Sequence, residues 1–292
     1  MLRGLRFVAA LGGIFAVLPA LAPSAAAAVL PSVSPMAKVS YRPAAVAAHL
    51  ASYRASYALT LTRADPGGAV VAGDGRISIE FADVCQGYTL TQRLRTRTAD
   101  DSGAVVESDL TSSSFESRDG KRLQFAIRNQ VNGIVVESYN GVARIPKPGG
   151  AGRAVFTQPK RAPLVLPAGT VFPTMQLRLL LQAAAAGRNF VSVPVFDGPG
   201  EGGLSQTGSF IGKRQPARYA GVPAGLKGLA WWPVRMAYFA ANGHGMRPDY
   251  EVGFRLFANG VSTRLVLDFP SFSFDGRLTH FRLLPRFPCR HG

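Results

Sequence analysis

The stretch RLQFAIRNQVNGIVVESYNGVARI, residues 122–145, has the pattern of a β-hairpin followed by a third strand. Asn-Gly pairs at 132–133 and 140–141 interrupt it. This dipeptide favours tight hairpin turns, because both central residues of such a turn have positive φ. The stretch DYEVGFRLFANGVSTRLVLDF, residues 249–269, predicts another hairpin of the same kind. Neighbouring segments of the chain are therefore expected to pair as antiparallel strands.

Strand patterns continue through most of the chain. Tyr57, Leu59 and Leu61 alternate with smaller or polar residues, which places them on one face of a strand. Further turn signals are the pairs Asp74-Gly75, Asp119-Gly120, Asn242-Gly243, Asn259-Gly260 and Asp275-Gly276. An antiparallel sheet with so many strands must curl, close or split into a sandwich. We predict a mainly β protein whose long antiparallel sheet curls into an open barrel or spiral.

Two α-helices are predicted, at about residues 42–54 and 173–187. The first has Pro43 in its opening turn and is rich in alanine, which favours a helix. The second begins at Pro173 and has Gly187 at its C-terminal end. Its apolar side chains cover nearly the whole circumference, as in a buried helix. We expect this helix to plug the cavity that a curled sheet leaves.

The N-terminus has the layout of a secretory signal peptide. Arg3 and Arg6 come before or at the start of the apolar run FVAALGGIFAVLPALA, and small residues follow in an A-x-A arrangement. A membrane anchor is the alternative, but glycines and a proline interrupt the apolar run. We predict a signal peptide over 1–28 with cleavage near Ala28, a single domain over 29–292, and a location outside the cytosol.

Export determines how the charge and the cysteines are interpreted. The formal net charge of +16 favours anionic partners such as phospholipid head groups or acidic proteins, and export makes nucleic acid an unlikely ligand. Cys85 and Cys289 would enter an oxidising compartment, where one disulfide between them is the simplest arrangement. Two free thiols or an intermolecular bond are the alternatives.

Two side-chain stripes are candidates for binding. Arg93, Arg95 and Arg97 share one face of a predicted strand and are candidate contacts for an anionic partner; the alternative is a solvated outer face. In LAWWPVRMAYF, residues 229–239, an aromatic and apolar stripe could bind sugar or lipid. Such a stripe is more often the core face of a strand.

Catalytic motifs are missing from the sequence. It contains neither G-x-S-x-G nor H-E-x-x-H, and GSFIGKRQ at 208–215 departs from a phosphate-binding loop because Arg214 stands where a hydroxyl is needed. Carboxylates lie on many predicted strands, but no spacing marks two of them as a glycosidase pair. We predict that the protein is not an enzyme and uses no metal, cofactor or nucleotide; a cell-wall hydrolase is a weak alternative.

Several long stretches carry a resemblance to a known family. They are KVSYRPAAVAAHLASYRASYALTL, LPAGTVFPTMQLRLLLQAAAAG, VPVFDG, WWPVRMAYF and YEVGFRLFANGVSTRLVLDFPSFSFDGRLTHFRLLP, and they are followed by the late Cys289. In extent and order they resemble the EipB family, the cell-envelope integrity proteins B of Alphaproteobacteria. The match spans about residues 38–289 and contains no catalytic motif.

The resemblance implies a sheet wound into an open barrel or spiral, with two helices, a cavity and a disulfide between Cys85 and Cys289. It further implies a periplasmic, non-enzymatic protein that supports envelope integrity under stress, with a tetratricopeptide-repeat protein of the periplasm as a partner. The leading prediction is therefore binding of a partner protein or envelope component. The alternative is a carrier or sensor of an anionic lipid or glycolipid, held in a basic cavity.

Overall fold

The computed structural model describes residues 6–10, 14–18, 50–241 and 247–289. One antiparallel sheet dominates it, and all but one of its strands pair along a single path. In pairing order the strands are β10 (Leu164–Leu166), β9 (Gly152–Gln158), β8 (Ile134–Arg144), β7 (Arg122–Val131), β6 (Val105–Ser117), β5 (Gly87–Ala99), β4 (Ala72–Val84), β3 (Tyr53–Ala64), β17 (Phe272–Leu283), β16 (Ser262–Asp268), β15 (Tyr250–Phe257), β14 (Ala230–Ala240), β12 (Leu204–Ile211) and β11 (Phe190–Phe196). The short β13 (Gln215–Pro216) pairs with β14.

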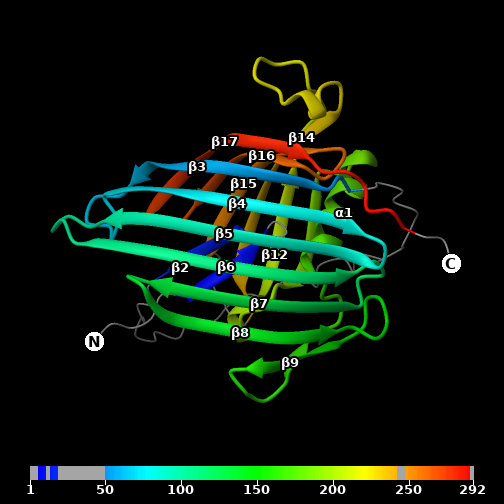
Figure 1. Cartoon of the computed structure of the whole chain (residues 1–292), viewed down its shortest axis with the longest axis horizontal. Coiled ribbons are helices and arrows are strands. Elements are labelled where there is room, and N and C mark those ends of the chain that lie inside the picture. Colours follow the sequence, from blue (N-terminus) through cyan, green and yellow to red (C-terminus); the bar gives the residue numbers. More distant parts are fainter. Residues whose placement is uncertain (1–5, 11–13, 19–49, 242–246, 290–292) are drawn as a thin grey trace, which may run out of the picture.

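The sheet curls until its two ends nearly meet (Figure 1). Val171, which follows β10, forms a parallel bridge with Val195 of β11. The Val171 amide donates to the Pro194 carbonyl at 2.9 Å, and the Phe196 amide donates to the Val171 carbonyl at 3.0 Å. These bonds satisfy backbone groups that an open edge would expose. The predicted barrel-like antiparallel sheet is confirmed.

The alternation seen in the sequence places the apolar side chains inside the barrel. Ile77, Leu94 and Leu110 lie opposite one another across β4, β5 and β6, and all are buried. The aromatic and apolar stripe of residues 229–239 lies in β14 and is also buried, so it is a core face. Period-two burial follows from the pleat, since successive side chains point to opposite faces.

Helix α1 (Pro173–Ala185) confirms the second predicted helix, with an end two residues earlier. Gly187 has a φ of +70°, which a glycine adopts without strain. The Arg188 amide donates to the Ala183 carbonyl at 2.8 Å and the Gly187 amide to Ala184 at 3.2 Å, so the helix ends in a Schellman motif. In Figure 1, α1 lies at the same side of the barrel as the C-terminal tail.

The first predicted helix is wrong where it can be checked. Residues 42–49 lie outside the described residues, but the remainder of the 42–54 segment is not helical and β3 begins at Tyr53. Tyr53 and Ala55 pair with β4 on one side and with β17 on the other. Two ladders of hydrogen bonds and the burial of alternate side chains therefore outweigh the helix preference of nearby alanines.

Three predicted turns are also wrong, because their glycines lie inside strands. A Cβ atom at Gly141 would lie 2.6 Å from both the Phe125 ring and the Val155 carbonyl. At Gly75 it would lie 2.4 Å from the Arg95 carbonyl, and at Gly276 it would lie 2.9 Å from Leu265. These glycines allow close approach within the sheet.

Other predicted turns are confirmed. Asn132 and Gly133 both have positive φ, and they join β7 to β8. The pair Asp119-Gly120 joins β6 to β7, and Asn259-Gly260 joins β15 to β16. The turn predicted at 242–243 lies outside the described residues.

The predicted signal peptide, 1–28, is described only over β1 (Arg6–Ala10) and β2 (Ile14–Leu18), which pair as an antiparallel hairpin. The rest of that segment lies outside the described residues. In the ranges that the structure describes, no helix has the length and apolar character needed to cross a membrane.

Candidate functional site

A buried carboxylate holds the start of α1. Glu116 of β6 is only 3% exposed, and its side chain points into the barrel, as does that of Leu110 on the same strand. Its Oε2 accepts a hydrogen bond from the Thr174 amide at 2.6 Å, and its Oε1 accepts one from the Met175 amide at 2.8 Å. The N-cap residue, Phe172, contributes no side-chain bond of its own. Glu116 therefore supplies the cap that the local sequence of α1 lacks.

Burial raises the pKa of Glu116 to about 7, because its ionised form loses contact with water. The amides of Thr174 and Met175 oppose this shift, as does the positive charge of Arg178. A carboxyl group with such a pKa is often catalytic, but both oxygens of this one are engaged by the helix. Its position favours a structural role, in which α1 is held across one end of the barrel.

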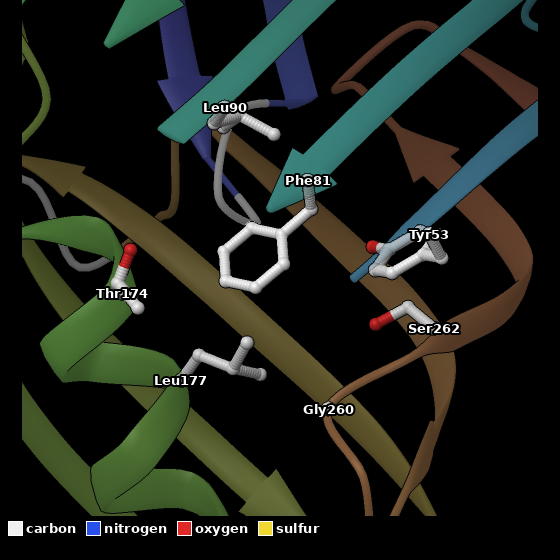
Figure 2. Close-up of a pocket in the computed structure, with 7 residues that line it drawn as sticks. All are labelled: Tyr53, Phe81, Leu90, Thr174, Leu177, Gly260 and Ser262. Carbon is white, nitrogen blue, oxygen red and sulfur yellow. The ribbon is translucent and has the colours of Figure 1, made fainter. Parts of the chain in front are cut away.

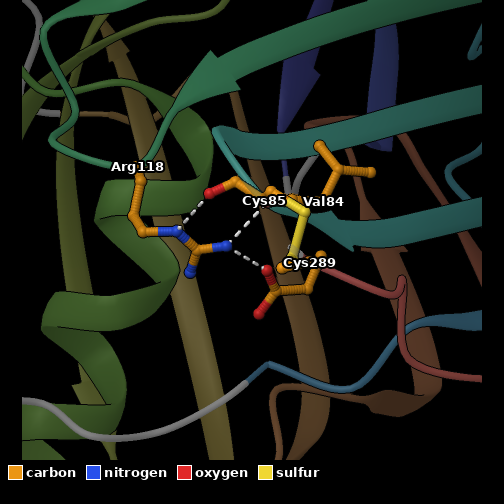
Figure 3. The surroundings of a disulfide bond; sticks show 5 residues. Val84, Cys85, Arg118 and Cys289 are labelled. Carbon is orange, nitrogen blue, oxygen red and sulfur yellow. Dashed lines mark hydrogen bonds and ion pairs between the residues drawn. A yellow bond between two sulfur atoms is a disulfide. The ribbon is translucent and has the colours of Figure 1, made fainter. Parts of the chain in front are cut away.

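The disulfide lies at the same end. Cys85, in the turn between β4 and β5, is bonded to Cys289; their Cα atoms lie 5.4 Å apart, and their sequence separation is 204. The predicted pairing is confirmed. Figure 3 shows the guanidinium of Arg118 beside it, where Arg118 donates to the carbonyls of Val84 at 2.7 Å and Cys85 at 3.2 Å. This turn is thus held from two sides.

Arg118 has a second set of contacts that link the turn to the helix. It forms an ion pair with Asp83, and its guanidinium lies 5.1 Å from the centre of the Tyr88 ring. Its carbonyl accepts a hydrogen bond from Arg178 of α1 at 3.1 Å. The β4–β5 turn, the β6–β7 turn and α1 are therefore joined as one assembly, which we call the closed end (Asp83–Tyr88, Glu116–Arg118, Pro173–Arg178 and Cys289).

The space beneath the closed end is small. One cavity here has a volume of about 20 Å³. Figure 2 shows the residues that line it: Tyr53, Phe81, Leu90, Thr174, Leu177, Gly260 and Ser262. A neighbouring cavity of about 20 Å³ lies between α1 and the inner faces of β6 and β7. Each has room for about one water molecule. The helix thus fills this end of the barrel, as expected of a plug.

The interior differs from the basic cavity expected for an anionic-lipid carrier. Among the described residues, the buried carboxyl groups are Glu116 and Asp197, and no Lys or Arg side chain is buried. Cations lie on the outer surface instead, where water solvates them. The described interior therefore lacks the positive lining that would compensate an anionic head group.

The arginine stripe lies on the outer face of β5 and is matched by carboxylates of β6. Arg93 donates to both carboxylate oxygens of Asp109, at 2.8 and 2.5 Å, and Arg95 approaches the same group at 3.1 Å. Arg97 lies 3.7 Å from Glu107. The hydrogen bond from Arg93 is the main cause that lowers the pKa of Asp109. The structure thus brings the three predicted residues together, but on a surface that already pairs them.

Glu116 and Arg118 were not singled out from the sequence. One feature of the sequence could have identified Glu116: it is an even number of residues from Leu110, so both side chains point to the inner face of the same strand. A carboxylate at an inward position is unusual and needs a buried partner. Arg118 carries no such signal, because its contacts come from residues that turns bring together.

The comparisons with known proteins agree with this architecture. Residues 44–285 match a model of the EipB-like family. The chain belongs to this family. A relative, cell envelope integrity protein EipB of Brucella abortus (strain 2308), is 33% identical over 242 residues, which cover 80% of this chain and 84% of the relative.

A solved structure shares the fold of this EipB-like chain. It is a crystal structure described as a beta-barrel-like protein of domain of unknown function DUF1849 from Brucella abortus. The two have a TM-score of 0.76 at 30% sequence identity, and the match covers 82% of this chain and 100% of that chain. The resemblance stated from the sequence is therefore confirmed for both family and fold.

Proposed function

We propose that the protein is exported to the periplasm and supports cell-envelope integrity there by binding a partner protein, without catalysing a reaction. Its family membership supports the envelope role, since a relative is named for envelope integrity. The observation that supports binding on the outer surface is the distribution of charge. The buried carboxyl groups lie inside the barrel, and the cations lie on its outside. Contacts with an anionic partner would therefore form on the outer surface.

The proposal that the protein is not an enzyme is supported by the structural roles of its most reactive side chains, Glu116 and the two cysteines. The carboxyl of Glu116 has a raised pKa, but it caps α1. Both cysteines are joined in a disulfide. Within the described ranges, no three His, Cys, Asp or Glu side chains gather as a metal site would require.

A periplasmic protein with tetratricopeptide repeats remains the partner suggested by the family resemblance, and stress resistance remains the expected phenotype. An anionic lipid or glycolipid held inside the barrel has no support from the described interior. The predicted stripe of Arg93, Arg95 and Arg97 remains a candidate contact, although its pairing with Asp109 and Glu107 reduces its free charge.

Complementation tests this proposal. A strain lacking its own copy of the gene should regain resistance to detergent and to cell-wall antibiotics when it expresses the full chain. A form without residues 1–28 should stay in the cytosol and fail to complement, although it accumulates to the same level. Complementation by that cytosolic form would contradict the periplasmic role. Native mass spectrometry of periplasmic protein should show no retained lipid.

A further inference from the structure

One part of the barrel wall is unpaired on one side. Strand β17 pairs with β3 along its whole length, from Phe272 to Leu283. Its pairing with β16 ends at Gly276, opposite Leu265. Beyond that point, the edge of β17 that faces away from β3 has no strand partner among the described residues. An edge of this kind presents backbone donors and acceptors to another chain.

The register identifies the backbone groups on that edge. The Leu284 amide donates to the Ser52 carbonyl at 2.8 Å, just beyond the pair formed by Leu283 and Tyr53. Antiparallel partners alternate between hydrogen-bonded and non-hydrogen-bonded pairs. Arg282 therefore bonds to β3, and the backbone groups of Phe281 and Leu283 point to the unpaired edge.

A groove of about 430 Å³ runs along this edge. One wall is the end of β17, from Leu278 to Leu283, and the other is a loop that includes Gly221 and the short 3-10 helix η2 (Ala224–Leu226). The loop protrudes beside the end of β17 in Figure 1. No backbone hydrogen bond joins it to Phe281 or Leu283 within the described residues. The loop thus leaves the backbone groups of Phe281 and Leu283 without a hydrogen-bond partner, although its Gly225 lies against the side chains of both residues.

Further contacts, outside the groove, hold the loop in place. The guanidinium of Arg255 lies 4.6 Å from the centre of the Tyr219 ring and 5.0 Å from that of the Trp231 ring. The Trp231 indole donates to the Pro216 carbonyl at 3.2 Å. Leu226, the last residue of η2, is fully buried. These contacts form the second wall before any ligand arrives, which lowers the cost of ordering it on binding.

The two segments that form the groove are positively charged; Arg282 lines the groove, and Arg277 precedes the lining residue Leu278. Segments 212–228 and 276–292 each hold four basic residues and neither Asp nor Glu. Arg277, Arg282 and Lys227 are exposed, and none of them has an ion-pair partner among the described residues. This differs from the arginine stripe on β5, where carboxylates of β6 lie within ion-pair distance.

We propose that this groove binds an extended, acidic peptide segment of a partner protein, which adds to β17 as an antiparallel or parallel strand. The backbone groups of Phe281 and Leu283 would supply main-chain hydrogen bonds, and Arg277, Arg282 and Lys227 would select acidic side chains. A membrane surface would use the same charges but would leave the backbone edge without partners. The accessible edge therefore favours a peptide. The inference rests on the proposed function only in assuming a protein partner.

Selection from a phage-displayed library of short random peptides tests the inference on purified, disulfide-bonded protein. Wild type should enrich sequences rich in Asp and Glu. Those peptides should bind the Arg277→Ser/Arg282→Ser variant more weakly, by on the order of tenfold. The Arg144→Ser/Arg153→Ser variant is the matched control, because it removes two exposed charges from β8 and β9. Enrichment of peptides without excess acid, or equal binding to both variants, would overturn the proposal.

Amide hydrogen exchange, measured by NMR, distinguishes backbone hydrogen bonding from binding by charge alone. A selected peptide should slow exchange at the Phe281 and Leu283 amides and leave Arg282, which already bonds to β3, unchanged. Displacement of the peptide by phosphatidylglycerol vesicles without that protection would assign the surface to lipid and overturn the inference. The selection needs no cells, so its failure and a failure of complementation are separate results.

Discussion

The closed end of the barrel and the outer wall of β5 and β6 both hold ionised groups, but under opposite conditions. Glu116 at the closed end is 3% exposed and is held by two backbone amides. The Arg93 side chain on the wall is 47% exposed and shares its carboxylate with Arg95. Water screens the charges on the wall but is largely excluded from the Glu116 carboxyl group. Changes at the closed end should therefore have large effects, and changes on the wall small ones.

The largest effect is expected from Leu180→Asp. Leu180 of α1 is 1% exposed, so the variant would bury a carboxylate with no compensating partner. We expect a loss of about 5 kcal/mol in the free energy of unfolding, or failure to fold. Urea denaturation measures it, with Leu180→Ala as the control for lost packing. A stability equal to that of Leu180→Ala would mean that water reaches this part of α1.

Loss of the disulfide should come next. Cys85→Ser, Cys289→Ser and the double variant should each lose about 2 to 5 kcal/mol, because the bond closes a loop of 204 residues. The double variant should be no less stable than either single variant. Alkylation without reductant, followed by intact-mass analysis, should find no free thiol in wild-type protein. Two alkylated cysteines would show that the bond does not form.

Glu116 should make stability depend on pH. Its folded pKa of about 7 lies above its usual value of 4.5, so the folded state holds this proton more tightly than the unfolded state does. The resulting stabilisation is fully present below about pH 4.5 and is lost as the pH rises through 7, with a total near 3 kcal/mol.

Glu116→Gln cannot ionise and should lack this component. Urea denaturation of both proteins between pH 4.5 and 8 isolates it, because every other titrating group is shared. The stability of wild type relative to Glu116→Gln should fall with rising pH. A rise instead would show that the two amides of α1 outweigh the burial of the carboxylate.

The smallest effect is expected on the wall. Arg95→Ser leaves Arg93 bonded to Asp109, so the free energy of unfolding should change by less than about 1 kcal/mol. The Arg93→Ser/Arg95→Ser/Arg97→Ser variant should still bind the acidic peptides selected on the β17 groove. If that variant loses peptide binding, the stripe and not the groove is the contact for an anionic partner.

Basic residues on β5 and β17 show how far a charge pattern can be interpreted without a fold. The stripe on β5 is conspicuous in the sequence, yet β6 places Asp109 and Glu107 beside it. Arg277 and Arg282 are spaced more widely in the sequence, yet no carboxylate forms an ion pair with them among the described residues. The number of like charges in a segment therefore does not predict how many of them lack an ion-pair partner. That number depends on which residues the neighbouring strand places beside them.

The glycines make the same point for backbone structure. Asn132-Gly133 and Asn140-Gly141 are alike in sequence, but only the first is a turn. Gly141 lies within β8, where the Phe125 ring and the Val155 carbonyl leave no space for a Cβ atom. Those neighbours belong to other strands, so no local pattern reveals them.

By itself, the sequence determined the features that depend on local periodicity and on residue chemistry. Alternation predicted the strands and the apolar interior, the apolar circumference predicted the burial of α1, and two cysteines predicted one disulfide. Only the tertiary structure decided which charges are paired, that Glu116 caps α1, that Tyr53 begins a strand, and that the end of β17 is unpaired. Each of these depends on residues that lie far apart in the sequence and meet when the sheet curls.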